Sequence, residues 1–94
     1  MNKTNILVWG LGYVGTVSSA CLSKLGFKIT GIDMDRNKIE SFNNRVCPIK
    51  EPELDKIIIG SIDNGYFEAI NSVPKNLNDF EFSLICVGTP SKND

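Results

Sequence analysis

The chain has 94 residues, which is enough for one small domain, and its 41% hydrophobic and 22% charged residues are ordinary for a globular protein. Ten basic and eleven acidic side chains leave a net charge of −1, so we expect no nucleic-acid partner. No apolar run approaches the roughly 20 residues that span a bilayer, and we therefore expect no membrane partner and a cytoplasmic location.

The first predicted element is a strand that ends in a glycine-rich turn. Residues 6–9 are apolar, and residues 10–15 read GLGYVG, with the spacing G-x-G-x-x-G. Between a strand and a helix, this spacing is typical of a dinucleotide-binding turn. Gly10 permits the tight turn, Gly12 lets a pyrophosphate approach the backbone, and Gly15 lets the helix pack close to the strand. A glycine-rich turn without a ligand is the alternative.

A helix follows over residues 13–25, where apolar side chains recur with helical spacing. Its expected buried face consists of Val14, Val17, Cys21, Leu22 and Leu25. Gly26 is expected to end it. Residues 27–33 then predict a second strand, parallel to the first and reached through a right-handed connection.

Asp33 ends this second strand, eighteen residues after the last glycine of the turn, where the fingerprint has an acidic residue. Its carboxylate is expected to bind the ribose hydroxyls and to repel a 2′-phosphate, which favours NAD over NADP, although Arg36 nearby weakens this preference. The alternative is a helix N-cap without a ligand, but Asp35 can cap the helix predicted over residues 36–44. Lys38 lies in the first turn of that helix, where it either touches the ligand or is merely solvated.

The second half of the chain continues the alternation of helices and strands. A short helix is predicted over residues 53–60, with Pro52 at its start. Asn64-Gly65 predicts a turn, and residues 66–70 alternate as a third strand. A polar connection leads from there to the last apolar segment.

Residues 82–87 predict a fourth strand that is apolar enough to be covered on both faces. Thr89 follows its carboxyl end and is expected to face the same crevice as Gly12, because ligands bind where the strand order of an open α/β sheet reverses. The predicted fold is thus a Rossmann-type doubly wound parallel sheet, incomplete, with about four strands in the order 3-2-1-4. Residues 1–94 form one domain in this prediction.

Catalysis and metal binding have little support in the composition. Histidine is absent, so no nucleophile paired with histidine can form within the chain. Three cysteines without paired spacing predict reduced thiols, no disulfide framework and no metal site. Cys21 and Cys86 are expected in the core. Cys47 lies in a predicted loop, where a thiol can react, but nothing near it argues for a lowered pKa.

Five segments together resemble the nucleotide-sugar 6-dehydrogenases, the family of UDP-glucose and GDP-mannose dehydrogenases. These segments are GLGYVG at 10–15, ACL at 20–22, GID at 31–33, PIKEP at 48–52 and VGTPSK at 87–92. The resemblance covers essentially the whole chain, and residues 17–22 and 86–93 look more like the GDP-mannose branch. Glu53 is a departure, because the family usually has glycine after the Glu-Pro pair.

The resemblance implies an NAD-dependent oxidation of a sugar's primary alcohol to a carboxylate by two hydride transfers. It implies backbone contacts from Tyr13 and Val14 to the pyrophosphate and a ribose contact from Asp33. Lys38 would lie beside that ribose, and Thr89 would also contact the cofactor. The family's catalytic cysteine and the residues that assist it lie beyond position 94, so no residue of this chain is expected to be catalytic.

The chain is therefore expected to be the N-terminal part of a longer, homo-oligomeric enzyme that binds a nucleotide sugar. A stand-alone NAD-sensing module and an inert remnant of a truncated gene are the alternatives. Alone, the chain is expected to bind NAD weakly or not at all, and to self-associate through the exposed edge of its fourth strand.

Overall fold

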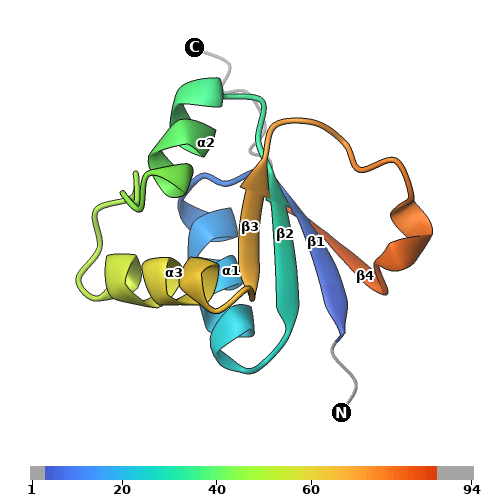
Figure 1. Ribbon diagram of the computed structural model, residues 1–94, viewed down its shortest axis with the longest axis horizontal. Coiled ribbons are helices and arrows are strands. Elements are labelled where there is room, and N and C mark those ends of the chain that lie inside the picture. Colours follow the sequence, from blue (N-terminus) through green and yellow to red (C-terminus); the bar gives the residue numbers. More distant parts are fainter. Residues whose placement is uncertain (1–3, 87–94) are drawn as a thin grey trace.

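The computed structural model describes residues 4–86 as a parallel sheet with helices packed on it (Figure 1). The strands are β1 (Asn5–Trp9), β2 (Lys28–Ile32), β3 (Phe67–Ile70) and β4 (Phe82–Ile85). The helices are α1 (Tyr13–Lys24), α2 (Arg36–Asn43) and α3 (Leu54–Asp63), with a 3₁₀ turn, η1 (Leu77–Asp79). The strands pair in the order β3-β2-β1-β4, and every pair is parallel, which confirms the predicted fold class and strand order.

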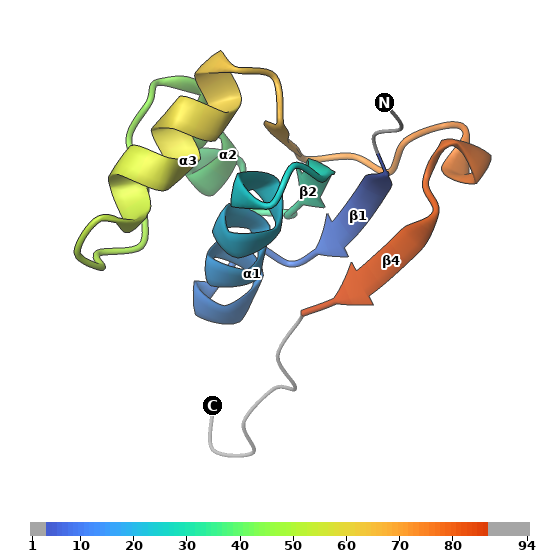
Figure 2. The ribbon, with the colours of Figure 1, turned by 90° about the horizontal axis from the view of Figure 1, so that it is seen from below.

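The three helices lie on one side of the sheet, and the connection from β3 to β4 runs on the other side (Figure 2). Side chains of β1 alternate between these sides: Ile6 and Val8 join the core under the helices, and Leu7 is buried on the opposite face. Phe42 and Phe67 extend the core, with ring centroids 5.4 Å apart in an edge-to-face contact. No helix within residues 4–86 is long and apolar enough to cross a membrane.

The buried face of α1 differs from the predicted one. Its buried residues are small: Gly15, Thr16, Ser19, Ala20 and Ser23. The predicted residues Val14, Cys21 and Leu25 are exposed, while Val17 and Leu22 are half-buried. The prediction was wrong because α1 approaches β1 and α3 closely, and only small side chains fit between them.

The helix α3 begins one residue later and ends three residues later than predicted. It runs from Leu54 to Asp63, and Pro52 lies in the preceding turn rather than at the helix start. Glu53 cannot be the first helical residue, because its backbone is left-handed, with φ of +68° and ψ of −11°. The extra turn at the other end brings Ser61 into a buried position against α1.

The prediction that the fourth strand is covered on both faces is wrong for the described residues. Phe82 is 64% exposed and Ile85 is 66% exposed. These two side chains point to opposite faces of the sheet, because side chains alternate along a strand. Within residues 4–86, β4 is one of the two edge strands and pairs only with β1.

The three cysteines are free thiols in different surroundings. Cys21 is exposed on α1, contrary to the predicted core position, whereas Cys86 is half-buried against the core. Cys47 is buried, and this burial raises the pKa of its thiol. A buried thiol with a raised pKa is a poor nucleophile, so the loop position of Cys47 does not make it reactive.

Candidate cofactor site

The turn between β1 and α1 is the centre of the candidate site. Gly10 has a φ of +99°, and its N–H donates to the carbonyl of Ile32 at 2.7 Å, which ties the turn to the end of β2. A Cβ added to Gly15 would lie 1.8 Å from the Gly10 carbonyl oxygen. The close approach of α1 to the turn therefore requires glycine at position 15, and the predicted structural roles of Gly10 and Gly15 are confirmed.

The N-terminus of α1 is open at Gly12, its N-cap. Apart from the two chain neighbours of Gly12, no atom of the described residues lies within 4 Å of a Cβ added there, and no side chain caps the helix. Tyr13 and Val14, the first two helical residues, have exposed side chains. The first backbone N–H groups of an α-helix have no partner within the helix, so this open end suits an anion such as a pyrophosphate.

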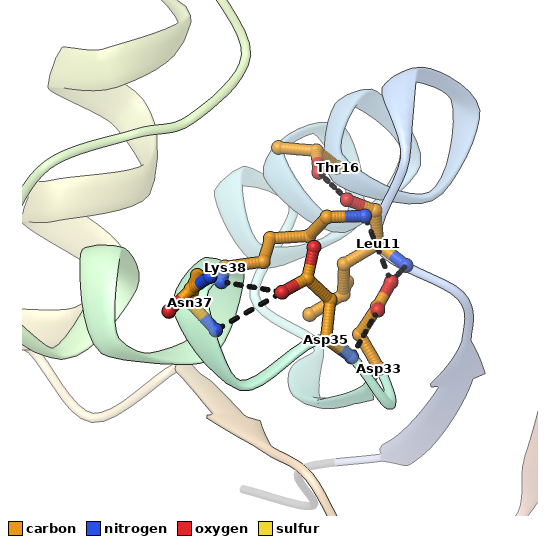
Figure 3. Close-up of polar contacts among 6 residues, drawn as sticks. All are labelled: Leu11, Thr16, Asp33, Asp35, Asn37 and Lys38. Atoms are coloured by element: carbon orange, nitrogen blue, oxygen red, sulfur yellow. Dashed lines mark hydrogen bonds and ion pairs between the residues drawn. The ribbon is translucent and has the colours of Figure 1, made fainter.

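The carboxylate of Asp33 lies directly after β2 and is held from three sides (Figure 3). The N–H of Leu11, in the glycine turn, donates to Oδ2 at 2.8 Å, and the N–H of Asp35 donates to Oδ1 at 2.9 Å. The ammonium of Lys38 bonds Oδ2 at 3.1 Å. Burial of Asp33 opposes its ionisation, but these donors outweigh burial and hold its pKa below the ordinary value.

The N-cap of α2 is Asp35, as predicted, so the alternative in which Asp33 caps this helix is wrong. Asp35 Oδ1 accepts the N–H of Asn37 at 3.0 Å and the N–H of Lys38 at 3.4 Å. This cap fixes the first turn of α2, from which Lys38 reaches Asp33 (Figure 3). With its side chain 23% exposed and paired to a carboxylate, Lys38 is more than a solvated surface cation.

Two residues that the sequence did not single out support the turn. Leu11 is fully buried, and its side chain fills the space over Gly31, where an added Cβ would lie 2.6 Å from a Leu11 methyl. Thr16 is also fully buried, and its hydroxyl donates to the Leu11 carbonyl at 3.0 Å (Figure 3). A glycine within a strand often marks such a close approach, so Gly31 was the available signal.

A cavity of about 190 Å³ opens where β1 and β2 end. Its lining residues are Trp9, Gly10, Ile32, Asp33, Met34 and Val73. A largely apolar slot beside a carboxylate suits a flat base attached to a ribose. A larger cavity of about 410 Å³, lined by the segment that joins α2 to α3 and by the start of α3, contains none of the predicted site residues.

These features together fit the adenosine and pyrophosphate parts of a dinucleotide. The structure brings Gly10, Gly12 and Gly15 together with Asp33 and Lys38 at the carboxyl ends of β1 and β2. Thr89, predicted as the opposite wall of the crevice, lies outside the described residues. Within those residues, no group of three or more His, Cys, Asp or Glu side chains could hold a metal ion.

The strand order, the glycine turn and the acidic residue after β2 define a dinucleotide-binding domain of the Rossmann type. The chain belongs to the UDP-glucose/GDP-mannose dehydrogenase family, NAD binding domain, whose family model matches residues 4–94. The cofactor of this domain is therefore NAD.

Individual relatives agree with this assignment. The chain is 38% identical over 89 residues to GDP-mannose 6-dehydrogenase of Pseudomonas syringae pv. syringae. The aligned region covers 95% of the chain and 20% of that relative. It is 38% identical over 90 residues to UDP-glucose 6-dehydrogenase YwqF of Bacillus subtilis (strain 168). Here the aligned region covers 96% of the chain and 20% of that relative.

Two solved structures have the same fold. The GDP-mannose dehydrogenase of Pseudomonas aeruginosa, solved as a ternary complex, has a TM-score of 0.85 and 39% identity, covering 93% of this chain and 20% of that one. A UDP-glucose dehydrogenase from Pyrobaculum islandicum has a TM-score of 0.85 and 27% identity, covering 95% of this chain and 21% of that one. The chain thus spans about 20% of the length of the relatives that it matches.

Proposed function

We propose that this chain is the N-terminal, cofactor-binding part of an NAD-dependent nucleotide-sugar 6-dehydrogenase. The whole enzyme would be a homo-oligomer that oxidises the primary alcohol of GDP-mannose or UDP-glucose to a carboxylate by two hydride transfers to NAD. Relatives with both names are 38% identical to the chain, so both nucleotide sugars belong to the proposal.

One observation carries the cofactor role: the Asp33 carboxylate is held ionised beside the glycine turn, bonded to the Leu11 N–H at 2.8 Å. In the proposal, this carboxylate accepts hydrogen bonds from the adenosine ribose. The backbone at Tyr13 and Val14 faces the pyrophosphate, and Gly12 leaves room for it. NAD supplies the hydride acceptor when it is bound, and the chain's own residues bind and orient it.

The proposal also holds that the 94-residue chain does not oxidise the sugar by itself. Oxidation through the aldehyde level would draw on a reactive thiol, and neither Cys47 nor Cys21 supplies one at the glycine turn. Cys47 is buried with a raised pKa, and Cys21 lies on the exposed face of α1 rather than at the glycine turn. The resemblance described above puts the family's catalytic cysteine beyond position 94.

The cofactor role can be tested by titrating the ¹⁵N-labelled chain with NAD and following backbone amide shifts. We expect weak, saturable shifts centred on residues 10–14 and 33–38. Asp33→Asn should weaken NAD binding about tenfold, because it removes a charge-assisted hydrogen-bond acceptor. Asp55→Asn, an exposed carboxylate at the start of α3, is the matched control and should bind like the wild type.

Two results would count against the proposal. Unchanged NAD affinity in a folded Asp33→Asn chain would show that Asp33 does not bind the ribose. A wild-type chain that binds NAD with micromolar affinity as a monodisperse monomer would favour a stand-alone NAD-sensing module instead. The dispersion of the amide spectrum reports in each case whether the variant is folded.

A further inference from the structure

Asn64-Gly65 lies directly after α3 and is the only place in the sequence where glycine follows asparagine. The backbone nitrogen that follows an asparagine can attack the side-chain amide of that asparagine. Glycine hinders this nitrogen least, because it has no Cβ. Both residues are exposed, so water reaches them. The dipeptide that ends α3 is therefore also the place in the chain where this chemistry meets the least steric opposition.

The reaction is a ring closure that needs no partner except water. The Gly65 nitrogen forms a bond to Asn64 Cγ, the bond from Cγ to Nδ2 breaks, and the leaving nitrogen takes the amide proton of Gly65 and departs as ammonia. The product is a succinimide ring. Water opens this ring at Cγ to give aspartate, or at the backbone carbonyl carbon to give isoaspartate, whose main chain runs through Cβ and Cγ.

The folded backbone keeps the reacting atoms apart. Asn64 is the C-cap of α3, with φ of −88° and ψ of −2°. A ψ near zero places the Gly65 nitrogen on the same side of the Cα–C bond as the Asn64 nitrogen, and thus away from Cβ. Ring closure requires the Gly65 nitrogen on the side of Cβ. The ring therefore cannot close while Asn64 keeps this conformation.

Two hydrogen bonds hold the end of α3 in this conformation. Gly65 has a φ of +82°, and its N–H donates to the Ile62 carbonyl at 3.1 Å. The Tyr66 N–H donates to the Ser61 carbonyl at 2.8 Å. These are the bonds of a Schellman motif, which ends a helix at a left-handed residue. The first of them also engages the proton that ring closure must remove, so the motif protects Asn64 in two ways.

We propose that Asn64 is a modification site of this chain, converted to aspartate and isoaspartate through Gly65, and that it reacts only in molecules whose last turn of α3 has opened. Helix ends open at a much lower free energy than the core of a protein. Isoaspartate lengthens the main chain by one atom, which disrupts the bonds of Gly65 and Tyr66 to α3. The new carboxylate also lies at the negative end of the helix dipole. The modification thus weakens the helix end from which it arises.

The end of α2 provides a matched control. Asn44 is the exposed C-cap of α2, with φ of −90° and ψ of 12°. The next residue, Arg45, is left-handed with φ of +64°, and its N–H donates to the Phe42 carbonyl at 3.0 Å. The two helix ends have the same backbone arrangement and differ in the side chain that follows asparagine. Arg45→Gly removes this difference.

The test compares the folded chain with the chain unfolded in guanidinium at the same neutral pH and temperature. Mass spectrometry of its peptides gives the rate at which each asparagine loses its amide, and isoaspartyl methyltransferase labels isoaspartate. In guanidinium, Asn64 should react faster than every other asparagine, and Arg45→Gly should bring Asn44 to a similar rate. In the folded chain, the rate at Asn64 should be at least about tenfold lower, because the open helix end is a minority state.

Hydrogen exchange of the Gly65 amide measures the opening directly, and the slowing at Asn64 should equal its protection within about threefold. Equal rates at Asn64 in the folded and the unfolded chain would show that the end of α3 does not protect it. A faster reaction at another asparagine in guanidinium, or an unchanged Asn44 in Arg45→Gly, would refute the assignment of the site. Slowing that matches the protection of β1 amides would mean that only global unfolding exposes Asn64. Each of these results overturns the proposal.

Discussion

Within residues 4–86, Glu53 is one of two residues other than glycine that have a positive φ. It precedes α3 with φ of +68°, in the left-handed region, where a Cβ approaches the following carbonyl oxygen. The family that this chain resembles usually has glycine after the Glu-Pro pair, and glycine adopts this conformation without strain. The departure noted in the sequence therefore falls on a position where the backbone favours glycine.

We expect Glu53→Gly to raise the free energy of unfolding by about 0.5–1 kcal/mol, because relief of strain exceeds the extra entropy that glycine gives the unfolded chain. Urea unfolding of the two proteins measures the difference. Glu53→Ala is the control, since it removes the carboxylate but keeps the Cβ, and it should give no increase. Equal stabilisation by alanine and glycine would mean that the charge, and not the backbone, is unfavourable.

The positions of the candidate-site residues were easier to predict than the backbone conformation of Glu53, because they follow from the order of neighbouring elements in the chain. A strand, the turn at Gly10 and a helix are consecutive, and Asp33 follows the next strand, so spacing alone indicates where they meet. Nothing in the residue type of Glu53 indicates a positive φ. The bond between Lys38 and Asp33 was also beyond prediction, since it depends on the side-chain conformation of an already positioned helix.

At the scale of elements, the packing of α1 on α3 depends on a pair of buried serines. The Ser23 hydroxyl donates to the Ala20 carbonyl at 3.1 Å and lies 2.8 Å from the Ser61 hydroxyl. Because Ser23 has one proton, Ser61 is the donor between the two side chains. This bond joins the last turns of two helices through side chains that are 38 residues apart in the chain.

A double-mutant cycle on these serines should give a coupling energy of about 1 kcal/mol, the net value of a buried hydrogen bond. The cycle uses Ser23→Ala, Ser61→Ala and the double variant, each unfolded in urea. It is needed because alanine also favours the helix at both positions, and this effect cancels in the cycle. Additive effects of the two substitutions would show that the hydrogen bond contributes nothing.

The same helix pair explains why the predicted face of α1 was wrong. Periodicity identifies the apolar stripe through Val14 and Cys21, and a helix on a protein surface normally buries such a stripe. The start of α1 instead lies against the glycine turn, where even a Cβ on Gly15 would collide with a carbonyl oxygen. The close approach of α1 to its neighbours therefore decides that its small residues are buried. The sequence of α1 alone does not indicate how close those neighbours lie.

At the scale of the whole molecule, the order of the strands in the sheet could be predicted from the sequence. Whether each strand is buried by other elements could not. Short parallel strands joined through helices have one favoured handedness, which limits the arrangement of β1, β2 and β3. The long connection after β3 then brings β4 to the other side of β1. Whether β4 is covered depends on neighbours that its own apolar sequence does not specify, and Phe82 and Ile85 are exposed in the described residues.

This exposure predicts that the 94-residue chain self-associates at about 0.1 mM, because an apolar edge strand is a template for pairing with another chain. Ile85→Lys should shift the chain toward monomer in sedimentation velocity and change its stability by less than about 0.5 kcal/mol, since Ile85 is 66% exposed. Leu25→Lys changes a similarly exposed apolar side chain between α1 and β2, away from β4, and should leave the association unchanged. A wild-type chain that stays monomeric, or an equal effect of the two lysines, would show that β4 does not drive association.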